Sequence, residues 1–308
     1  MINTMIVVAG PTASGKSSLG ISLAKKINGQ IISTDSMQVY KGMDIGTAKI
    51  RQMEGITHHL VDVVSPMDDF NIVMYKAMAD RAVDEIYKKN QVPILVGGTG
   101  FYIQAILYDI DFSMEAFDEN IRSQLEERAR NTSPDDLHDE LKRIDPKSAD
   151  IIHANNVRRV IRALEFYYTT GQMISEHNDE QRKKKSKYDL KYFVLNMPRD
   201  ILYKRIDKRV DEMIAQGLED EVKSLINQGV PRGSTAMQAI GYKEMLSYID
   251  GMISLDEAIN IIKRESRHYA KRQLTWFRRE KDAIWIDVEN FDFDSQKILG
   301  YMLDVINE

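Results

Sequence analysis

The sequence contains no cysteine and no apolar run of bilayer length. Without cysteine there is no disulfide framework, no thiolate metal site and no cysteine nucleophile, which is typical of a protein of the reducing cytoplasm. No basic N-terminal region followed by a long apolar stretch is present either, so neither export nor membrane insertion is expected. The six histidines show no metal-ligand spacing, so no zinc site is predicted. We therefore expect a cytoplasmic protein that does not bind a membrane.

Positive charge is in slight deficit, since the formal net charge at pH 7 is −5. This alone argues mildly against a nucleic-acid partner, but nucleic-acid binding depends on where lysine and arginine gather rather than on their sum. The 308 residues are enough to bury a substantial core, and they fit a kinase-sized core with an insertion.

A glycine-rich loop near the N-terminus is the most informative feature. It consists of Gly10, Pro11, Thr12, Ala13, Ser14, Gly15, Lys16 and Ser17. The apolar residues 5–8 before it predict a buried strand, and residues 17–26 after it predict a helix. In such a unit, backbone N–H groups and the positive end of the helix converge on an anion, Lys16 adds a point charge, and the Ser17 hydroxyl is placed to hold Mg²⁺. The loop predicts a site for two linked phosphates without identifying the molecule that carries them.

Strand and helix patterns alternate over the first ~110 residues, which predicts an α/β fold with a parallel sheet and helices on both faces. This resembles the core of a P-loop kinase. From residue 111 to 190 long polar helix patterns replace the strands, so we expect a mostly helical insertion there. The core would comprise residues 1–110 and 191–308. It would include a strand over 192–195, one long helix over 255–279 and a final strand over 283–287.

Asp35 follows the second predicted strand, at residues 30–33, and so lies at the carboxyl edge of the sheet beside the phosphate loop. A carboxylate there can act as a general base that takes a proton from an attacking nucleophile. The alternative is an Asx cap of the following turn, which is a common role for aspartate before serine.

Arg205 and Arg209 lie four residues apart, on one face of a predicted helix. Such a pair resembles the lid arginines of small P-loop kinases, which neutralise charge that develops on a phosphate oxygen. The alternative is a surface ion-pair ladder with Asp207 and Asp211. The strand over 92–96 ends in Gly97-Gly98-Thr99 rather than in the acidic residue of motor-like ATPases, so hydrolysis-driven work is not favoured.

The long C-terminal helix carries a broad positive stripe. At helical spacing, Lys263, Arg267 and Lys271 form one row, and Arg264, His268 and Arg272 form the row beside it. Few acidic residues interrupt this stripe, which favours contact with a phosphate backbone over a merely solvated face.

Several segments, taken in order along nearly the whole chain, resemble those of the bacterial tRNA dimethylallyltransferase family, also called isopentenylpyrophosphate transferases. They are residues 10–17, 35–40, 42–49, 97–102, 158–165, 238–244 and 271–278. Some are weak singly, but their order is highly specific. No cysteine/histidine finger follows the core as it does in eukaryotic relatives.

The resemblance implies transfer of a dimethylallyl group from dimethylallyl diphosphate to the exocyclic amine of the adenine 3′ of the anticodon, in tRNAs that read codons beginning with U. The phosphate loop would then hold the diphosphate of the prenyl donor. By the same resemblance Lys16, Arg209 and Mg²⁺ on Ser17 would stabilise the leaving group, Asp35 would accept the proton, and Thr12 and Thr99 would line the meeting point of the substrates.

The resemblance also implies a tRNA anticodon stem-loop as partner, bound in part by the C-terminal helix, and we expect the enzyme to be a monomer. The implied tRNA-binding residues are Asp35, Ser36, Met37, Gln38, Thr99, Arg122, Arg158, Arg159, Arg162, Gln238, Gly241, Tyr242, Lys243, Lys271, Arg272, Gln273, Thr275 and Arg278. The chain departs from some relatives at Gln238, where they have arginine, and at Arg158, where they have glutamine.

Three other functions remain compatible with the residues. A small-molecule kinase would use the same loop for ATP, but it has no use for a basic C-terminal helix. A cytokinin-type relative that prenylates free adenine nucleotides has the same weakness. A nucleotide-gated RNA-binding protein without chemistry would not need Asp35 and Arg209 beside the loop.

Overall fold

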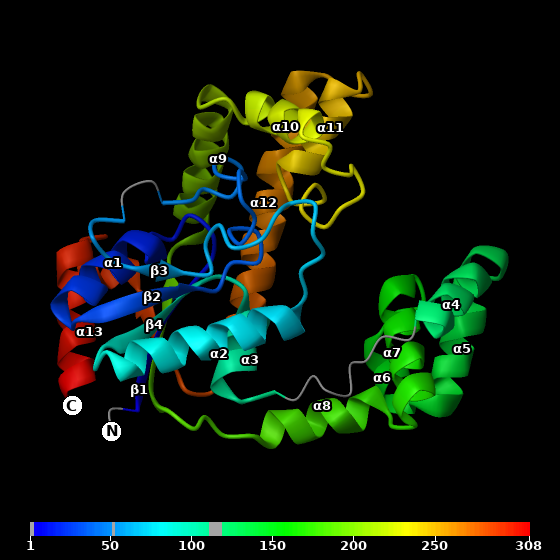
Figure 1. Cartoon of the computed structure of the whole chain (residues 1–308), viewed down its shortest axis with the longest axis horizontal. Helices are drawn as coiled ribbons and strands as arrows, with labels where there is room; N and C mark the ends of the chain where they lie inside the picture. The colour runs from blue at the N-terminus through cyan, green and yellow to red at the C-terminus, as the bar shows by residue number, and fades with distance from the viewer. Residues whose placement is uncertain (1–2, 51–52, 111–118) are drawn as a thin grey trace. The chain divides into compact units, whose positions relative to one another are not determined.

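The computed structural model describes residues 3–50, 53–110 and 119–308 (Figure 1). It divides into two compact units, one formed by Met1–Leu107 with Lys187–Glu308 and the other by Tyr108–Ser186. The start predicted for the insertion, residue 111, lies outside the described residues, and its predicted end at residue 190 lies slightly beyond the boundary at Ser186.

The first unit is built on a sheet in which all described strands are parallel and follow the order β3-β2-β4-β1-β5-β6. The strands are β1 (Thr4–Ala9), β2 (Gly29–Ser33), β3 (His58–His59), β4 (Val92–Gly97), β5 (Asp189–Asn196) and β6 (Ala283–Asp287). The central strand β1 pairs Val8 with Val96 of β4 and with Phe193 of β5. β1 and β4 are nearly continuous apolar runs, as expected for central strands of a sheet covered on both faces. The predicted α/β fold class is confirmed.

The helices of this unit cover opposite faces of the sheet. The connection from β1 to β2 runs across the sheet in the opposite direction to the connection from β3 to β4. Because such crossovers are right-handed, α1 (Lys16–Lys26) and α2 (Ile72–Lys88) fall on different faces. The C-terminal helix α13 (Ser295–Asn307) packs beside α1, and α3 (Gly100–Leu107) packs beside α2.

The remaining helices of the first unit follow β5. They are α9 (Arg199–Ala215), α10 (Leu218–Asn227), α11 (Tyr242–Ile249) and α12 (Leu255–Phe277), and the 3₁₀ helix Val288–Phe291 follows β6. The long helix α12 packs against α9, α11 and α3 (Figure 1). It ends at Phe277, two residues before the predicted limit near residue 279, because the next N–H groups, those of Arg279 and Glu280, donate to carbonyls three residues back instead of four.

The second unit is helical. It contains α4 (Glu119–Asn131), α5 (Pro134–Ile144), α6 (Pro146–Ile151), α7 (Val157–Thr170) and α8 (Ile174–Lys183). Its buried core is formed by leucine, isoleucine, valine and alanine side chains of α4, α5, α6 and α7. Helix α5 begins with a capping box between Ser133 and Asp136, which satisfies two N–H groups of the first turn.

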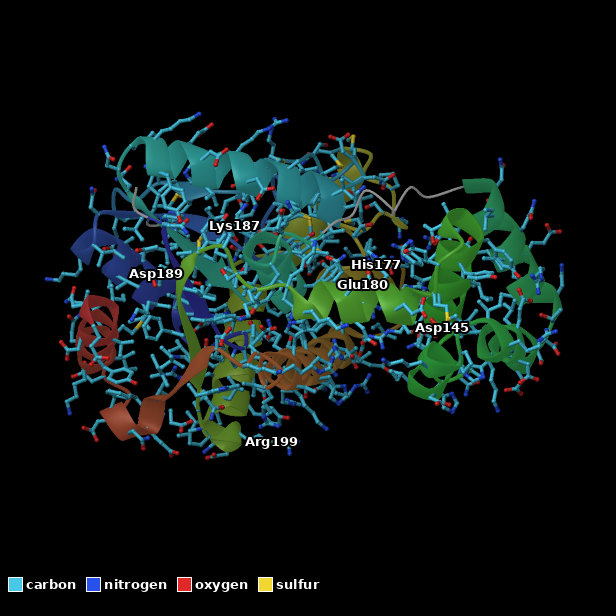
Figure 2. The ribbon with its side chains drawn as sticks, turned by 90° about the horizontal axis from the view of Figure 1, so that it is seen from below. Asp145, His177, Glu180, Lys187, Asp189 and Arg199 are labelled. Atoms are coloured by element: carbon cyan, nitrogen blue, oxygen red, sulfur yellow. The ribbon has the colours of Figure 1, made fainter. Side chains whose placement is uncertain are left out.

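Asp145 fastens this unit internally from the junction of α5 and α6 (Figure 2). It is 1% exposed; its Oδ1 accepts the N–H of Ser148, and its Oδ2 accepts the Ser148 hydroxyl and the N–H of Ser175 at the start of α8. Burial alone would raise the pKa of Asp145, but these hydrogen bonds lower it below its ordinary value. The carboxylate therefore ties α6 to α8.

We expect Asp145→Asn to destabilise the helical unit by about 2 kcal/mol at neutral pH, because the amide cannot accept all three hydrogen bonds. A carboxylate with a lowered native pKa stabilises the fold fully above its ordinary pKa of about 4, and this contribution is lost as the pH falls through the lowered value. The difference in stability between the wild type and Asp145→Asn should therefore become smaller at low pH. Hydrogen exchange of the α5 and α6 amides in the full-length protein measures it, with the exposed Asp139→Asn as control. Equal protection of the two variants at pH 7 would contradict this role.

Candidate active site

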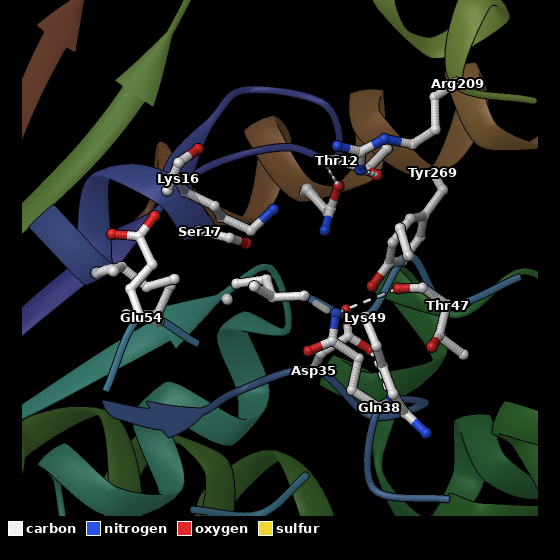
Figure 3. A pocket seen from close by; sticks show the side chains of 17 residues that line it. Thr12, Lys16, Ser17, Asp35, Gln38, Thr47, Lys49, Glu54, Arg209 and Tyr269 are labelled. Atoms are coloured by element: carbon white, nitrogen blue, oxygen red, sulfur yellow. Dashed lines mark hydrogen bonds between the residues drawn. The ribbon is translucent and has the colours of Figure 1, made fainter. Parts of the chain in front are cut away.

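The phosphate loop predicted from the sequence lines a pocket of about 370 Å³ at the carboxyl edge of the sheet (Figure 3). The pocket residues come from the loop and α1, the turn after β2, residues 47–50 with Glu54, the end of β4, and helices α9 and α12. They include Thr12, Lys16, Ser17, Asp35, Gln38, Thr47, Lys49, Glu54, Arg209, Tyr269 and Gln273. Helix α1 begins at Lys16, so its N–H groups and positive end face this space.

Lys16 is the cation at the centre of the loop. Its Nζ donates to the carbonyl oxygen of Pro11 at 3.1 Å. Burial lowers the pKa of Lys16 to about 8; the Asp35 carboxylate opposes this shift and the Arg209 guanidinium adds to it. The ammonium is therefore poised to gain stability when an anion enters the pocket.

Arg209 reaches the same pocket from α9 and donates to Thr12 Oγ1 at 3.3 Å. Burial lowers its pKa. Arg205 is exposed and does not line the pocket. The acids of the alternative ladder pair with α12 instead: Asp207 binds Arg267 and Asp211 binds Lys263, each at 2.6 Å.

Asp35 combines both roles considered from the sequence. Its Oδ1 accepts the N–H groups of Met37 at 2.9 Å and Gln38 at 3.3 Å, which is an Asx turn. Among the described residues, no group donates a hydrogen bond to its Oδ2. Asp35 lines the pocket with Lys16 and Arg209 (Figure 3). The turn fixes the carboxylate and leaves one oxygen for chemistry.

The residues around Asp35 complete this edge of the pocket. Ser36, Met37 and Gln38 are half-buried in the turn itself. The N–H of Thr99 donates to the carbonyl of Thr34, while the Thr99 hydroxyl is buried without a hydrogen-bond partner among the described residues. Such an orphaned hydroxyl can accept or donate a bond to a bound molecule.

Gln273 differs from its expected place on the tRNA surface. It is 5% exposed; its Oε1 accepts the N–H of Thr12 at 2.9 Å, and its Nε2 donates to the carbonyl of Gly98 at 3.0 Å. A Cβ on Gly98 would lie 2.0 Å from that Nε2, so only glycine permits this approach. Gln273 thus joins α12 to the phosphate loop, and its side chain is committed inside the protein.

Tyr242 also differs from its expected place on the tRNA surface. It is fully buried, and its hydroxyl donates to Glu221 Oε1 at 2.5 Å. The preceding Gly241 is buried as well. Burial together with Glu221 raises the pKa of the Tyr242 phenol, so it stays protonated. The Tyr242 side chain is part of the core rather than of an exposed RNA surface.

The other candidates of α11, α12 and the segment before them lie at the surface. Lys271, Arg272, Thr275 and Arg278 are exposed on α12, whereas Lys263 and Arg267 of the predicted stripe are bound by α9. Gln238 and Lys243 are exposed; Gln238 donates to the carbonyl of Arg232 and Lys243 lies 3.5 Å from Glu244. Arg264 and His268 of the stripe are exposed as well, but both lie beside Glu265. Among the described residues, the exposed cations of α12 without an acidic partner are therefore Lys271 and Arg272 in its C-terminal half.

The arginines of the second unit divide into two kinds. Arg158 and Arg159 are exposed in the first turn of α7. Arg122 and Arg162 approach the buried carboxylate of Glu165 at 3.8 and 3.4 Å. The latter two help to compensate a buried charge.

With this geometry in hand, the comparisons decide the family. The sequence matches the family model described as IPP transferase over residues 38–280. It is 52% identical over 306 residues to the tRNA dimethylallyltransferase of Lachnoclostridium phytofermentans, covering 99% of this chain and 97% of that protein. It is 47% identical over 306 residues to that of Acetivibrio thermocellus, with 98% of each covered. The chain belongs to the IPP transferase family.

Solved structures agree with this assignment. The tRNA delta(2)-isopentenylpyrophosphate transferase of Staphylococcus epidermidis aligns with a TM-score of 0.72 and 42% identity, over 99% of this chain and 98% of that one. A eukaryotic dimethylallyltransferase acting on tRNA aligns with a TM-score of 0.83 and 32% identity, over 99% and 80%. The resemblance to IPP transferases inferred from the sequence is confirmed. No helix among the described residues is long and apolar enough to cross a membrane.

Sequence reasoning missed several pocket residues of this IPP transferase. Tyr269 lies one turn before Gln273 on α12, and burial, with a contribution from Asp35, raises its pKa to about 12. Thr47 and Ile50 come from a loop without periodicity, so no local pattern places them at the pocket. The only available signal was their position in or beside the segment 42–49, which carries the family resemblance.

The lowered pKa of Lys16 predicts that affinity for an alkyl diphosphate falls above pH 8. Such a ligand loses its last proton near about pH 6, so in this range Lys16 is the group that titrates. Below its pKa the ammonium is charged and binds; above it, affinity should fall by up to about tenfold per pH unit. Titration calorimetry from pH 6.5 to 9.5 measures the effect, and Lys16→Arg, which stays charged, should remove it. Constant wild-type affinity up to pH 9.5 would contradict the shift.

Proposed function

We propose that this enzyme transfers the dimethylallyl group of dimethylallyl diphosphate to the exocyclic amine of the adenine 3′ of the anticodon, in tRNAs that read codons beginning with U. The carrying observation is that Asp35 and the anion-binding pair Lys16 and Arg209 line one pocket. A prenyl transfer needs a grip on the leaving group and a base for the acceptor within reach of each other. The names of the relatives, which are tRNA dimethylallyltransferases, support the same substrates.

The donor diphosphate is placed against the loop amides and Lys16. Cleavage of the allylic C–O bond leaves the electron pair and negative charge on the diphosphate. Lys16, the positive end of α1 and Arg209 then stabilise that charge. Arg209 is held over the loop by Thr12, so it is already placed where the charge develops.

The donor set of the pocket fits Mg²⁺. The described residues hold no cluster of three or more acidic, histidine or cysteine side chains that could bind a metal by itself. Mg²⁺ commonly keeps several waters and takes few protein ligands beside phosphate oxygens. Ser17, whose hydroxyl has no hydrogen-bond partner among the described residues, would supply the protein oxygen. Bound there, Mg²⁺ would add positive charge beside the leaving diphosphate.

The acceptor amine is a weak nucleophile, because its lone pair is delocalised into the adenine ring. As the new C–N bond forms, the amine loses a proton, and Asp35 Oδ2 is placed to accept it. The base must leave the anticodon-loop stack to reach the pocket. Thr12 and Thr99 would line the point where the two substrates meet.

The tRNA would be held by exposed side chains rather than by the buried Gln273 and Tyr242. Lys271, Arg272, Thr275 and Arg278 of α12, Gln238 and Lys243, and Arg158 and Arg159 of α7 are the exposed candidates. Contacts of this kind mix phosphate binding with recognition of unpaired bases. We further propose that the enzyme works in the cytoplasm as a monomer.

Deleting the gene and analysing hydrolysed tRNA by mass spectrometry tests the reaction. We expect isopentenyl-adenosine to disappear and to return with the wild-type gene. Unchanged content would eliminate the transferase and would leave the kinase alternative in place.

Replacing Asp35 tests the base. Asp35→Asn keeps an oxygen for the Asx turn but cannot accept a proton, so we expect turnover to fall by about 10²-fold or more with tRNA affinity nearly unchanged. Single-turnover kinetics and tRNA binding measure the two effects, with the exposed Asp68→Asn as control. An equal loss of tRNA affinity would show that Asp35 chiefly positions the adenine.

Replacing Lys271 and Arg272 tests the RNA surface. The double change to alanine should weaken tRNA binding and make its salt dependence shallower by roughly 0.7 to 0.9 per lost phosphate contact, in log–log terms. Binding of the prenyl donor should not change. Lys297→Ala, which removes a cation of α13 that is paired with Asp292, is the matched control. A wild-type salt slope in the double variant would exclude these residues from the interface.

A further inference from the structure

A single carboxylate on α10 holds the loop that forms one wall of the pocket. Glu221 Oε2 accepts the N–H groups of Asp44 at 2.9 Å and Ile45 at 2.7 Å, and its Oε1 accepts that of Gly46 at 3.1 Å. The Tyr242 hydroxyl also donates to Oε1. Four donors converge on one anion, which makes these charge-assisted hydrogen bonds strong and directional.

The loop that Glu221 holds is closed on itself. The N–H of Lys49 donates to the carbonyl of Asp44, and the N–H of Ala48 donates to that of Ile45, each at 3.0 Å. Lys49 Nζ donates to the carbonyl of Tyr40 at 2.6 Å and to Asp44 Oδ1 at 2.8 Å. Ala48 has a φ of 51°, a backbone angle that residues other than glycine rarely adopt. Residues 44–49 therefore form one compact turn. Its position is fixed at residues 44–46, whose N–H groups Glu221 binds.

The part of this turn that Glu221 does not bind faces the pocket. Thr47, Ala48 and Lys49 line the pocket that contains Lys16. The carbonyl of Thr47 accepts the side-chain amide of Gln38 at 3.2 Å, and the N–H of Gln38 donates to Asp35 Oδ1. A displacement of the turn would thus reach both the pocket wall and the Asp35 turn.

Gly46 of the turn packs directly against Tyr242 at the start of α11. A Cβ on Gly46 would lie 2.4 Å from a ring carbon of Tyr242. The hydrogen bonds of Glu221 draw the turn inward, and the Tyr242 ring stops it. Together they define one position of the wall.

We propose that Glu221 is a positioning residue, which sets the wall formed by residues 44–49 at the distance that encloses the donor diphosphate and keeps the Asp35 turn in place. This inference rests on the proposed function, because it assigns the diphosphate to that pocket. Glu221 touches no substrate and acts only through the turn.

Glu221→Gln tests it, because the amide keeps the shape of the side chain but loses the charge and half of its acceptor capacity. We expect the Kd for inorganic diphosphate and the KM for the prenyl donor to rise by about tenfold, while the Kd for tRNA changes by less than about twofold. Hydrogen exchange at residues 44–46 should accelerate. Glu219→Gln, on the same helix and paired among the described residues with Lys223 alone, should leave the diphosphate Kd, the donor KM and the exchange rate unchanged.

Gly46→Ala displaces the same turn from the opposite side. Because Gly46 does not have a positive φ, alanine is tolerated by the backbone, and the nearest atoms that its Cβ would meet belong to Tyr242. The same rise in diphosphate Kd and donor KM is expected.

Two results overturn the proposal. One is a lower melting temperature in both variants with unchanged diphosphate Kd and donor KM, which would make Glu221 merely structural. The other is unchanged exchange at residues 44–46 in Glu221→Gln. Failure of the wild-type protein to bind diphosphate at all would instead refute the proposed function, and the exchange experiment distinguishes the two failures.

Discussion

The active site depends on the buried side-chain amide of Gln273, which both accepts and donates a hydrogen bond. Gln273 accepts from the phosphate loop with its oxygen and donates to the carbonyl of Gly98 with its nitrogen, so a helix near the end of the chain is joined to loops that follow β1 and β4. A carboxylate could not donate and an ammonium could not accept, and either would bury a charge. Glutamine is suited to this position because it does both without charge.

Around that junction the site gathers groups that would be unfavourable elsewhere. A lysine with a lowered pKa, a half-buried arginine and an aspartate line one pocket. The two cations disfavour each other while the pocket lacks an anion, and the aspartate compensates them only in part. In the proposed reaction a bound diphosphate would relieve this repulsion, and part of its binding free energy would then come from an electrostatic imbalance built into the fold.

The sequence predicted those features that are encoded locally. The strand–loop–helix unit, the apolar strands of the sheet and the capped helices of the second unit follow from periodicity and turn chemistry within a few residues. Asp35 was placed at the sheet edge by the rule that ligands bind beyond the carboxyl ends of parallel strands. The short elements β3, α3, α6, α8 and α11 did not stand out, because their patterns are too brief or too polar.

The contacts that fix side-chain roles are distant in sequence and could not be predicted in this way. Gln273 reaches Thr12 across 261 residues, and Glu221 reaches Gly46 across 175. Helical spacing placed Lys263 and Arg267 on the basic stripe, yet Asp211 and Asp207 on another helix bind them. Periodicity shows which residues share a face, but only tertiary packing shows which of them stay accessible.

The ion pairs between α9 and α12 have a mechanical consequence. The helix that carries Arg209 is bound at Asp207 and Asp211 to the helix whose C-terminal half is exposed and basic. Any tilt of the basic helix would carry the arginine with it. The proposed contact of Arg209 with the leaving group and the proposed tRNA surface of α12 would then move together.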